Sequence, residues 1–186
     1  KIHILVEKSL ACSLGEVTEL NQLALEHDVV LLENFQFRFH PQLQFVKDVI
    51  DSGEIGEVRQ ISSSFGFPPF TDENNIRYDK SLGGGALLDA GAYPIKISQE
   101  LLGDDLFIGS ASLSYQDASG VDIWGSASLH SNKASVTSQI SFGFDHFYQC
   151  KLEVWGSKGI ICANRIFTAP PGFQADIQIQ TESGTR

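Results

Sequence analysis

The sequence contains no methionine, no long hydrophobic run and few basic residues. Its apolar stretches, such as Val29 to Leu32, are far shorter than the roughly 20 residues of a membrane-spanning helix. The 13 Lys and Arg are outnumbered by 23 Asp and Glu, so the formal net charge is -10. Nucleic-acid binding requires clustered Lys and Arg. We therefore expect a globular protein with an acidic surface that neither spans a membrane nor binds nucleic acid.

Cysteine is also scarce, and the cysteines form no framework. Cys12, Cys150 and Cys162 are an odd number, with no CxxC pair and no histidine at ligand spacing. The five histidines show no motif such as HExxH, so no metal site is predicted. Free thiols are typical of a reducing compartment, and the opening KIHILVEK lacks the apolar core of a signal peptide. We expect a cytoplasmic protein.

The first 35 residues follow a strand, helix, strand pattern. His3–Glu7 and Val29–Phe35 are short apolar runs, and between them Gly15–His27 carries apolar residues at helical spacing. Ser13 is a plausible N-cap, with Glu16 as its capping-box partner. This order predicts a right-handed crossover between parallel strands. Because the chain opens directly on a strand without an initiator methionine and closes without a terminal helix, we expect it to be cut at both ends.

The next part of the chain is mainly helical. A helix is expected from Pro41, which suits a first helical turn, to the left-handed cap Gly53. A strand over Val58–Phe67 follows, and Phe70–Leu82 is a polar loop without periodicity. Ala86–Leu102 is mostly helical by its apolar spacing.

From Phe107 onward, small polar and apolar residues alternate in short segments. The turn signals DASG, HSNK, GFDH and GSKG separate them at roughly ten-residue spacing, which indicates an antiparallel meander. The expected strands are Ile108–Tyr115, Val121–Leu129, Ala134–Phe142, Phe147–Trp155 and Gly159–Cys162. The predicted fold class is α+β: a large, mostly antiparallel (mixed) open sheet with helices on one face, preceded by a β-α-β unit.

Three consecutive glycines open the segment GGGALLDAGAYP, from Gly83 to Pro94. A phosphate-binding fingerprint needs glycines at the first, third and sixth positions after a strand, but the sixth position is Leu88 and no strand precedes. A loop-to-helix junction, where backbone passes close to other groups, fits better. Asp89 and Tyr93 follow at helical i, i+4 spacing and can point the same way. Taken alone, such a pair is more often a surface hydrogen bond than a catalytic pair.

Glu7 and Lys8 follow the first expected strand. They lie at its carboxyl end, where open α/β sheets place their ligands. A single lysine, however, is more often a solvated surface charge. Position in the fold therefore raises interest in Lys8 without assigning it a role.

Four segments in fixed order give a more specific signal: LVEKSLA, ENFQFRFHPQ, GEIGEVR and NIRYDKSLGGGALLDAGAYP. Together they resemble the glucose-fructose oxidoreductase, inositol dehydrogenase and MocA family of nicotinamide-dependent oxidoreductases. The resemblance runs from Lys1 to about Gly159 and is strongest to the branch of nucleotide-sugar ketoreductases and dihydrodiol-type dehydrogenases. Tyr93 stands where the inositol dehydrogenase branch has a histidine.

The resemblance implies roles for matching residues. The family's Glu-Lys-Pro motif falls on Glu7 and Lys8, with Ser9 in place of the proline. The expected catalytic residues are Lys8, Tyr93 and Asp89; the cofactor-binding residues are Glu7, Lys8 and Arg38; and the substrate-binding residues are Arg77, Asp89 and Tyr93. The cofactor would be NAD or NADP, and the substrate a sugar or sugar nucleotide.

The resemblance also implies a domain division. Residues 1–35 would be the C-terminal remnant of a truncated Rossmann dinucleotide-binding domain. Residues 36–186 would be an α+β substrate-binding, catalytic and oligomerisation domain, truncated at its C-terminus. The protein would form homo-oligomers through the sheet face, and we expect Trp124 and Trp155 in the core and the dimer face.

Ketone reduction places hydride on carbon and negative charge on oxygen, so a residue must supply a proton. We expect Tyr93 to be this general acid or base. The Lys8 ammonium would lower the pKa of Tyr93 and polarise the carbonyl, and Asp89 would orient substrate hydroxyls or Lys8. The alternative is a non-catalytic binding or oligomerisation module that keeps the fold but lacks a complete cofactor site.

Overall fold

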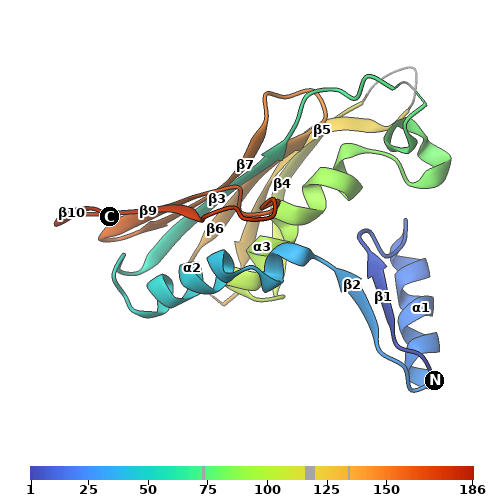
Figure 1. Ribbon diagram of the computed structural model, residues 1–186, viewed down its shortest axis with the longest axis horizontal. Helices are drawn as coiled ribbons and strands as arrows, with labels where there is room; N and C mark the ends of the chain where they lie inside the picture. Colours follow the sequence, from blue (N-terminus) through green and yellow to red (C-terminus); the bar gives the residue numbers. More distant parts are fainter. Residues whose placement is uncertain (73, 116–119, 134) are drawn as a thin grey trace.

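The computed structural model describes residues 1–186 except 73, 116–119 and 134. The first 35 residues form the expected unit: β1 (Ile4–Glu7) pairs in parallel with β2 (Leu31–Asn34), and α1 (Leu14–Glu26) connects them. Ser13 Oγ accepts a hydrogen bond from Glu16 N at 3.3 Å and donates one to the Glu16 carboxylate at 3.0 Å. This confirms Ser13 as the N-cap, whereas the Glu16 carboxylate accepts from Cys12 N at 3.1 Å, one residue before the N–H that a standard capping box uses. In Figure 1 the unit, drawn in blue, lies to one side of the main sheet.

The helical elements of the second part lie between residues 36 and 102. They are η1 (Gln36–Phe39), α2 (Pro41–Asp51), η2 (Ile76–Tyr78), η3 (Lys80–Leu82), η4 (Leu87–Gly91) and α3 (Ala92–Leu102). Gly53 has φ 73°, which confirms it as the left-handed residue after α2. The expected helix over Ala86–Leu102 is π-helical in η4 and α-helical from Ala92. None of the described helices combines the length and apolarity needed to cross a bilayer.

The main sheet has eight strands in the order β10-β9-β8-β7-β3-β6-β5-β4. They are β3 (Val58–Gly66), β4 (Leu106–Tyr115), β5 (Asp122–Ser131), β6 (Thr137–Gly143), β7 (Gln149–Gly156), β8 (Gly159–Asn164), β9 (Asp176–Thr181) and β10 (Gly184–Thr185). Most neighbouring pairs are antiparallel, and the pair of β3 and β6 is parallel. The predicted fold class, a mixed sheet with helices on one face, is confirmed.

The prediction of an antiparallel meander is wrong at one position, because β6 and β7 are not neighbours in the sheet. β3 lies between β6 and β7, parallel to β6 and antiparallel to β7. The GFDH segment therefore does not close a hairpin but carries the chain past β3, over two inter-strand spacings of about 4.8 Å each. Alternating polarity reports which face a strand buries but not which strand it pairs with. Two parts of the predicted pattern lie outside the described residues: positions 117–119 of the DASG turn, and Ala134, the first residue of an expected strand.

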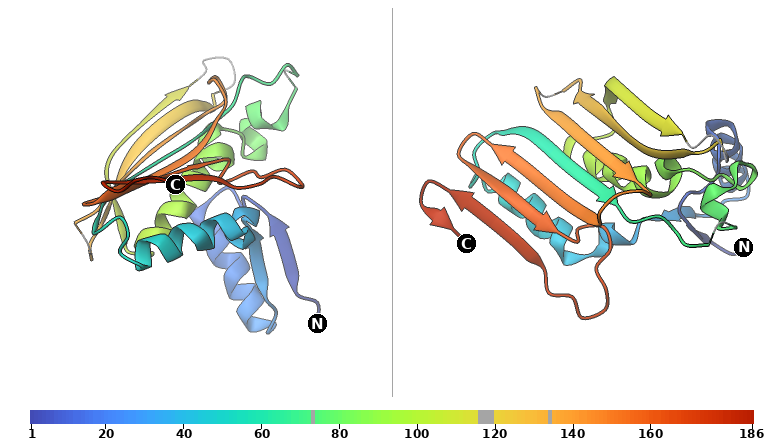
Figure 2. Two further views of the ribbon diagram at one scale, coloured as in Figure 1. Left: turned by 60° about the vertical axis from the view of Figure 1, so that its left-hand side comes forward. Right: turned by 90° about the horizontal axis from the view of Figure 1, so that it is seen from above.

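The core lies between the sheet and the helices. Figure 2 shows α2 and α3 on the same face of the sheet, which leaves the other face open. Ile61 of β3, Ile97 of α3 and Leu152 of β7 are fully buried in this layer. Trp124 and Trp155 are 42% and 55% exposed and alternate with buried residues, so they belong to the open face. The expectation that they contribute to the core is wrong.

Candidate active site

Lys8 directly follows β1 and reaches across to η4. Its Nζ donates a hydrogen bond to the Asp89 backbone carbonyl at 2.8 Å and forms an ion pair with Oδ1 of the Asp89 carboxylate. The Lys8 side chain is only 11% exposed. Because a buried ammonium is costly unless it is paired, the two Asp89 oxygens explain how Lys8 is held there. The Lys8 charge is thus not a solvated surface charge.

Asp89 has a second cationic partner. Arg77 Nε donates to Asp89 Oδ2 at 2.6 Å, so each carboxylate oxygen faces one cation. Burial raises the pKa of Asp89, but hydrogen bonds and charges from Lys8 and Arg77 together outweigh it and leave the pKa below the usual value. The carboxylate is therefore ionised at neutral pH. Two cations against one carboxylate leave the cluster with a local positive charge.

The three glycines bring the Arg77 loop against η4. Gly84 N donates to Asp79 O and Gly85 N to Arg77 O, both at 2.9 Å. A Cβ at Gly84 would lie 2.6 Å from the Arg77 carbonyl oxygen, too close for any side chain. Gly85 has φ 120°, a conformation that favours glycine. The glycines thus permit the close approach of backbone that places Arg77 beside Asp89.

Tyr93 lies one helical turn beyond Asp89 and is only 6% exposed. The Lys8 Nζ is 5.2 Å from the centroid of its ring. The ring sits among four phenylalanines at centroid distances of 5.0 to 6.0 Å: Phe35, Phe37, Phe65 and Phe167. Each is a hydrophobic neighbour that excludes water from the phenol.

The expected lowering of the Tyr93 pKa by Lys8 is wrong. Burial raises the pKa of Tyr93, the charges of Asp89 and Glu7 raise it further, and a hydrogen bond with Gln36 opposes them. Lys8 does not reverse this direction because its ammonium is paired with Asp89 and lies over the face of the ring. Tyr93 is therefore a protonated phenol at neutral pH.

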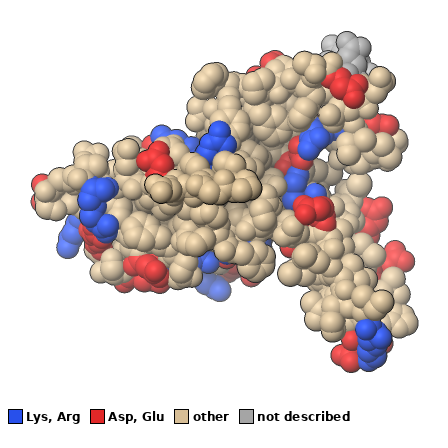
Figure 3. All heavy atoms as spheres, viewed as in Figure 1, with Lys and Arg blue, Asp and Glu red and all other residues tan. Residues whose placement is uncertain are grey.

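A cavity of about 260 Å³ adjoins the cluster. Its charged lining residues are Lys8, Arg77 and Asp89, and Gly83, Gly84 and Gly85 form part of its wall. Figure 3 shows basic and acidic atoms side by side where the β1–α1–β2 unit meets the rest of the molecule. An anionic or strongly polar ligand fits this combination of partly buried cationic groups and close backbone.

The remaining predicted residues lie outside the cluster. Glu7 Oε1 accepts a hydrogen bond from Asn34 Nδ2 at 2.7 Å at the ends of β1 and β2. Arg38 Nε is 2.7 Å from Glu100 Oε1 on α3, and Lys47 pairs with the same carboxylate. The structure thus brings together Lys8, Arg77, Asp89 and Tyr93, and it directs the charge of Arg38 towards Glu100.

Two further residues support the site and were not predicted. Asp122 Oδ2 of β5 accepts a hydrogen bond from Leu87 N at 2.6 Å, at the start of η4. Ser9 Oγ donates to Leu88 O at 2.8 Å. The segment DIW gives no sign that its aspartate caps a distant helical turn, since that contact depends on the tertiary fold. In the sequence, Ser9 is distinguished only by standing in place of the family's proline.

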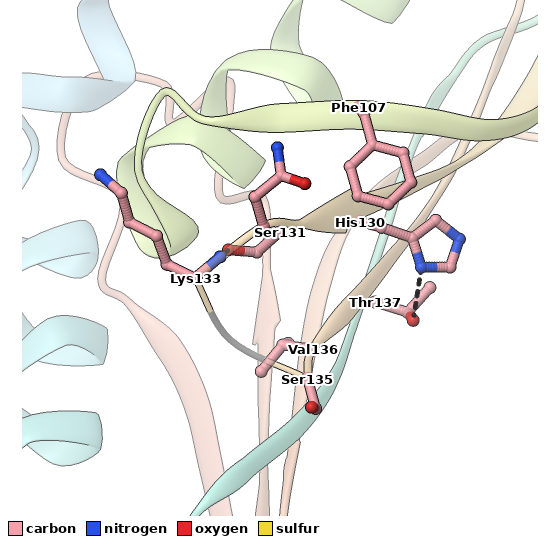
Figure 4. A pocket seen from close by; sticks show the side chains of 8 residues that line it. Phe107, His130, Ser131, Lys133, Ser135, Val136 and Thr137 are labelled. Carbon is pink, nitrogen blue, oxygen red and sulfur yellow. Dashed lines mark hydrogen bonds between the residues drawn. The ribbon is translucent and has the colours of Figure 1, made fainter.

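A second cavity, of about 420 Å³, lies at the far end of the sheet. Figure 4 shows Phe107 and His130 stacked, with His130 Nδ1 hydrogen-bonded to Thr137 Oγ1 at 3.3 Å. Lys133 is among its lining residues. Among the described residues, no three His, Cys, Asp or Glu side chains are close enough to hold a metal ion. The cluster around Lys8 therefore offers the more specific chemistry.

Comparison with known proteins identifies relatives over nearly the whole chain. A family model described as the GFO/IDH/MocA C-terminal domain matches residues 43–162. A dTDP-3,4-didehydro-2,6-dideoxy-alpha-D-glucose 3-reductase of Saccharopolyspora spinosa is 40% identical over 178 residues, which are 96% of this chain and 53% of that protein. A trans-1,2-dihydrobenzene-1,2-diol dehydrogenase of Xenopus laevis is 37% identical over 94 residues, 50% of this chain and 28% of that protein.

The solved structures agree with these relatives. The 3-ketoreductase KijD10 of Actinomadura kijaniata, in complex with NADP and TDP-benzene, superposes with a TM-score of 0.94 at 38% identity, over 99% of this chain and 56% of that one. An aldose-aldose oxidoreductase of Caulobacter crescentus has a TM-score of 0.88 at 18% identity, which shows a shared fold alone. The chain thus spans about half the length of the curated relatives it matches.

Proposed function

Because the chain belongs to the GFO/IDH/MocA family, we propose that it forms the substrate-binding and catalytic part of a nicotinamide-dependent ketoreductase. The proposed substrate is a sugar nucleotide, whose carbonyl is reduced. The observation that carries the proposal is the Lys8, Arg77 and Asp89 cluster beside the buried phenol of Tyr93. Three free cysteines fit the cytoplasmic location inferred from the sequence.

The domain division follows the same proposal. The β1–α1–β2 unit of residues 1–35 would be the end of a dinucleotide-binding domain, and residues 36–186 the substrate-binding part. The carboxyl ends of β1 and β2 carry Glu7, Lys8 and Asn34, the edge at which parallel sheets bind ligands. Polar and cationic groups at that edge fit a nicotinamide and its carboxamide. The relatives are about twice as long, and we propose that the residues holding the rest of the cofactor lie outside these 186 residues.

Several relatives support this substrate and cofactor. The S. spinosa protein is named as a reductase of a dTDP-linked keto sugar, and KijD10 was solved with NADP and TDP-benzene. Solved forms of KijD10 include variants with one tyrosine replaced by phenylalanine or one lysine replaced by alanine or glutamate. The substituted lysine and tyrosine are about as far apart along that chain as Lys8 and Tyr93 are here, which supports the roles proposed for these two residues. Because KijD10 was solved with NADP, we propose NADP as the cofactor.

The bound nicotinamide would supply the hydride. The residues of this chain would supply the proton and stabilise the negative charge that develops on the carbonyl oxygen. Tyr93 donates its phenolic proton to the oxygen that becomes the product hydroxyl. The raised pKa of Tyr93 keeps that proton in place at neutral pH. The Lys8 ammonium, which Asp89 fixes over the ring, stabilises the negative charge that develops on the same oxygen. Arg77 adds positive charge at the cavity wall.

Replacing Tyr93 by phenylalanine tests this assignment in the intact protein. We expect turnover of a dTDP-linked keto sugar, followed by NADPH oxidation, to fall by about 10²-fold because the general acid is lost. NADPH affinity, followed by nicotinamide fluorescence, should stay unchanged. The matched control is Tyr115→Phe, which removes the same hydroxyl from a 61% exposed side chain at the end of β4. Equal turnover in both variants would refute the role of Tyr93.

The open face of the sheet supports a second proposal, assembly into homo-oligomers. Trp124 and Trp155 lie on this face and are largely exposed, and exposed aromatic residues are typical of protein interfaces. We expect light scattering to give a dimer or larger assembly and Trp155→Lys to shift it towards monomer. A monomeric mass for the unsubstituted protein would contradict the assembly. If assembly holds while the intact protein binds no NADPH, the chain is the non-catalytic module considered above.

A further inference from the structure

Arg165 is the one arginine without a carboxylate partner in the described part of the chain. The other four arginines pair with acidic side chains: Arg38 with Glu100, Arg59 with Glu57, Arg77 with Asp89 and Arg186 with Glu54. Arg165 directly follows β8 and is exposed, and the formal net charge of the protein is -10. An unpaired guanidinium on so acidic a chain is available to an anion from outside the protein.

The backbone of Arg165 is held in an uncommon conformation. Its φ of 50° lies in the left-handed region, which residues other than glycine rarely adopt. Gln42 of α2, which is 1% exposed, donates from Nε2 to the Arg165 carbonyl at 3.4 Å. The backbone N of the next residue, Ile166, donates to Cys150 O at 3.3 Å. These contacts fix the direction in which the Arg165 side chain leaves the backbone, and such conformations are common at functional sites.

The guanidinium of Arg165 lies over the ring of Tyr148. Its central carbon is 5.0 Å from the ring centroid, and Nη1 donates a long hydrogen bond of 3.5 Å to the Tyr148 hydroxyl. That hydroxyl is also hydrogen-bonded to Thr168 Oγ1 at 3.1 Å. Stacking uses the flat face of a guanidinium and leaves donors at its edge free. Arg165, Tyr148 and Thr168 thus place a cation and two hydroxyls together.

The segment that carries Arg165 packs against Tyr93. The ring of Phe167, two residues after Arg165, is 5.7 Å from the Tyr93 ring. Phe167 N donates to Cys150 Sγ at 3.4 Å, and Cys150 pairs in register with Phe65 of β3. The ring of Phe65 also contacts Tyr93, at 5.0 Å, so the segment lies on the face of the sheet that carries the phenol. Phe167 therefore links the Arg165 segment directly to the proposed proton donor.

We propose that Arg165, Tyr148 and Thr168 bind the diphosphate of the sugar-nucleotide substrate. A guanidinium donates two parallel hydrogen bonds to a phosphate. The two hydroxyls share one proton between them, so one O–H remains to donate to another phosphate oxygen. The diphosphate is attached to the sugar ring that carries the carbonyl, and binding it here holds that ring beside Tyr93. The identity of the substrate rests on the proposed function.

The other cations beside Tyr93 are less suited to the diphosphate. Lys8 and Arg77 both contact the Asp89 carboxylate, which offsets part of their charge, whereas Arg165 keeps its full charge for a ligand. NADP also carries phosphates. Measuring the affinities for dTDP and NADPH in the same variants distinguishes the two sources of the anion.

Replacing Arg165 by glutamine tests the proposal in the intact protein. We expect the Kd of dTDP, from titration calorimetry, to rise about tenfold to hundredfold, the scale of a lost charged hydrogen bond. Arg165→Lys keeps the charge but not the parallel donors and should raise the Kd about fivefold. The matched control is Arg59→Gln, an exposed arginine of β3 paired with Glu57, which should keep the Kd within about twofold. The Kd of NADPH should stay unchanged in all three variants.

Tyr148 provides a second route to the same result. Tyr148→Phe keeps the ring beneath the guanidinium but removes the hydroxyl, and it should raise the Kd of dTDP about threefold. An unchanged Kd in folded Arg165→Gln overturns the proposal, and so does a rise in the Kd of NADPH in place of dTDP. If Arg165→Gln does not fold, unchanged Kd values in Arg165→Lys and Tyr148→Phe overturn it.

Turnover separates this inference from the proposed function. In Arg165→Gln, the KM of a dTDP-linked keto sugar should rise about tenfold or more while kcat changes less than about threefold, because the diphosphate does not take part in the hydride transfer. If the unsubstituted protein reduces this sugar and Arg165→Gln has the same KM, the inference fails and the proposed function stands. If the unsubstituted protein neither binds dTDP nor reduces the sugar, the proposed substrate fails and the inference fails with it.

Discussion

The β1–α1–β2 unit leaves most of its apolar side chains exposed, whereas the sheet domain buries a large apolar core between the sheet and its helices. In α1, all of which is described, Ala24 alone is buried, and Leu25 is 76% exposed. In the sheet domain, Ile61 and Leu152 are completely buried. Apolar burial is the main source of folding free energy, so we expect the two regions, within these 186 residues, to differ in stability. Lys8 lies in the region with little apolar burial, and Tyr93 lies in the region with an extensive apolar core.

The site therefore joins a stable part to a less stable one. Its connections are the pairing of Lys8 with Asp89 and the hydrogen bond of Ser9 to Leu88. A two-stranded parallel sheet with one helix is marginal by itself, so these polar contacts help to place the end of β1. Substitutions that affect one region or the contacts between them test how far the comparison holds.

The largest effect is expected from the centre of the sheet. Leu152→Ala in β7 should lower the free energy of unfolding by about 3 kcal/mol, because it removes buried methyl groups and leaves a cavity. The matched control, Leu25→Ala in α1, should change it by less than about 0.5 kcal/mol because that side chain is exposed. Urea denaturation measures both. Equal losses would mean that α1 buries Leu25 in solution.

The contact between the regions should have an intermediate effect. Asp89→Asn leaves Lys8 and Arg77 without their counter-charge and should cost about 1 to 3 kcal/mol at pH 7, less than for a fully buried pair because all three side chains are partly exposed. Because the folded-state pKa of Asp89 is lowered, its contribution is complete above the unfolded value of about 3.9 and is lost as pH falls through the folded pKa.

The difference between Asp89→Asn and the unsubstituted protein should consequently shrink below pH about 4. Urea denaturation at pH 7 and in mild acid measures this. The matched control is Asp105→Asn, an exposed carboxylate hydrogen-bonded to Asn132 rather than to a cation. A difference that stays constant down to the acid limit would show that the Asp89 charge does not stabilise the fold.

Much of this architecture could be predicted from sequence because its signals are local. The N-cap at Ser13, the cap at Gly53 and the alternation of the strands depend on neighbouring residues, and the structure contains them. The position of β3 between β6 and β7 depends on pairing between segments about 80 residues apart, for which the sequence has no local signal. Fold class was therefore predictable, and strand order was not.

The site shows the same division. Spacing placed Asp89 and Tyr93 on one helical face, and the end of a parallel strand drew attention to Lys8. The pKa of Tyr93 could not be predicted, because it depends on the phenylalanines and acidic groups that the fold gathers around the phenol. The π-helical register of η4 was also hidden, because the apolar spacing over Ala86–Leu102 predicts a helix without distinguishing its register.

The smallest effect is expected at the start of α1. Ser13→Ala removes the N-cap hydrogen bond and should destabilise the helix by about 1 kcal/mol, whereas Ser13→Asn keeps a capping group and should cost little. If the β1–α1–β2 unit opens independently of the sheet, amide exchange should accelerate about fivefold in α1 and stay unchanged in β3 and β7. We expect this local result because few apolar contacts bind α1 to the rest of the molecule. Equal acceleration in α1 and β7 would show instead that the two regions unfold together. The segments that carry Lys8 and Tyr93 would then open with the same free energy.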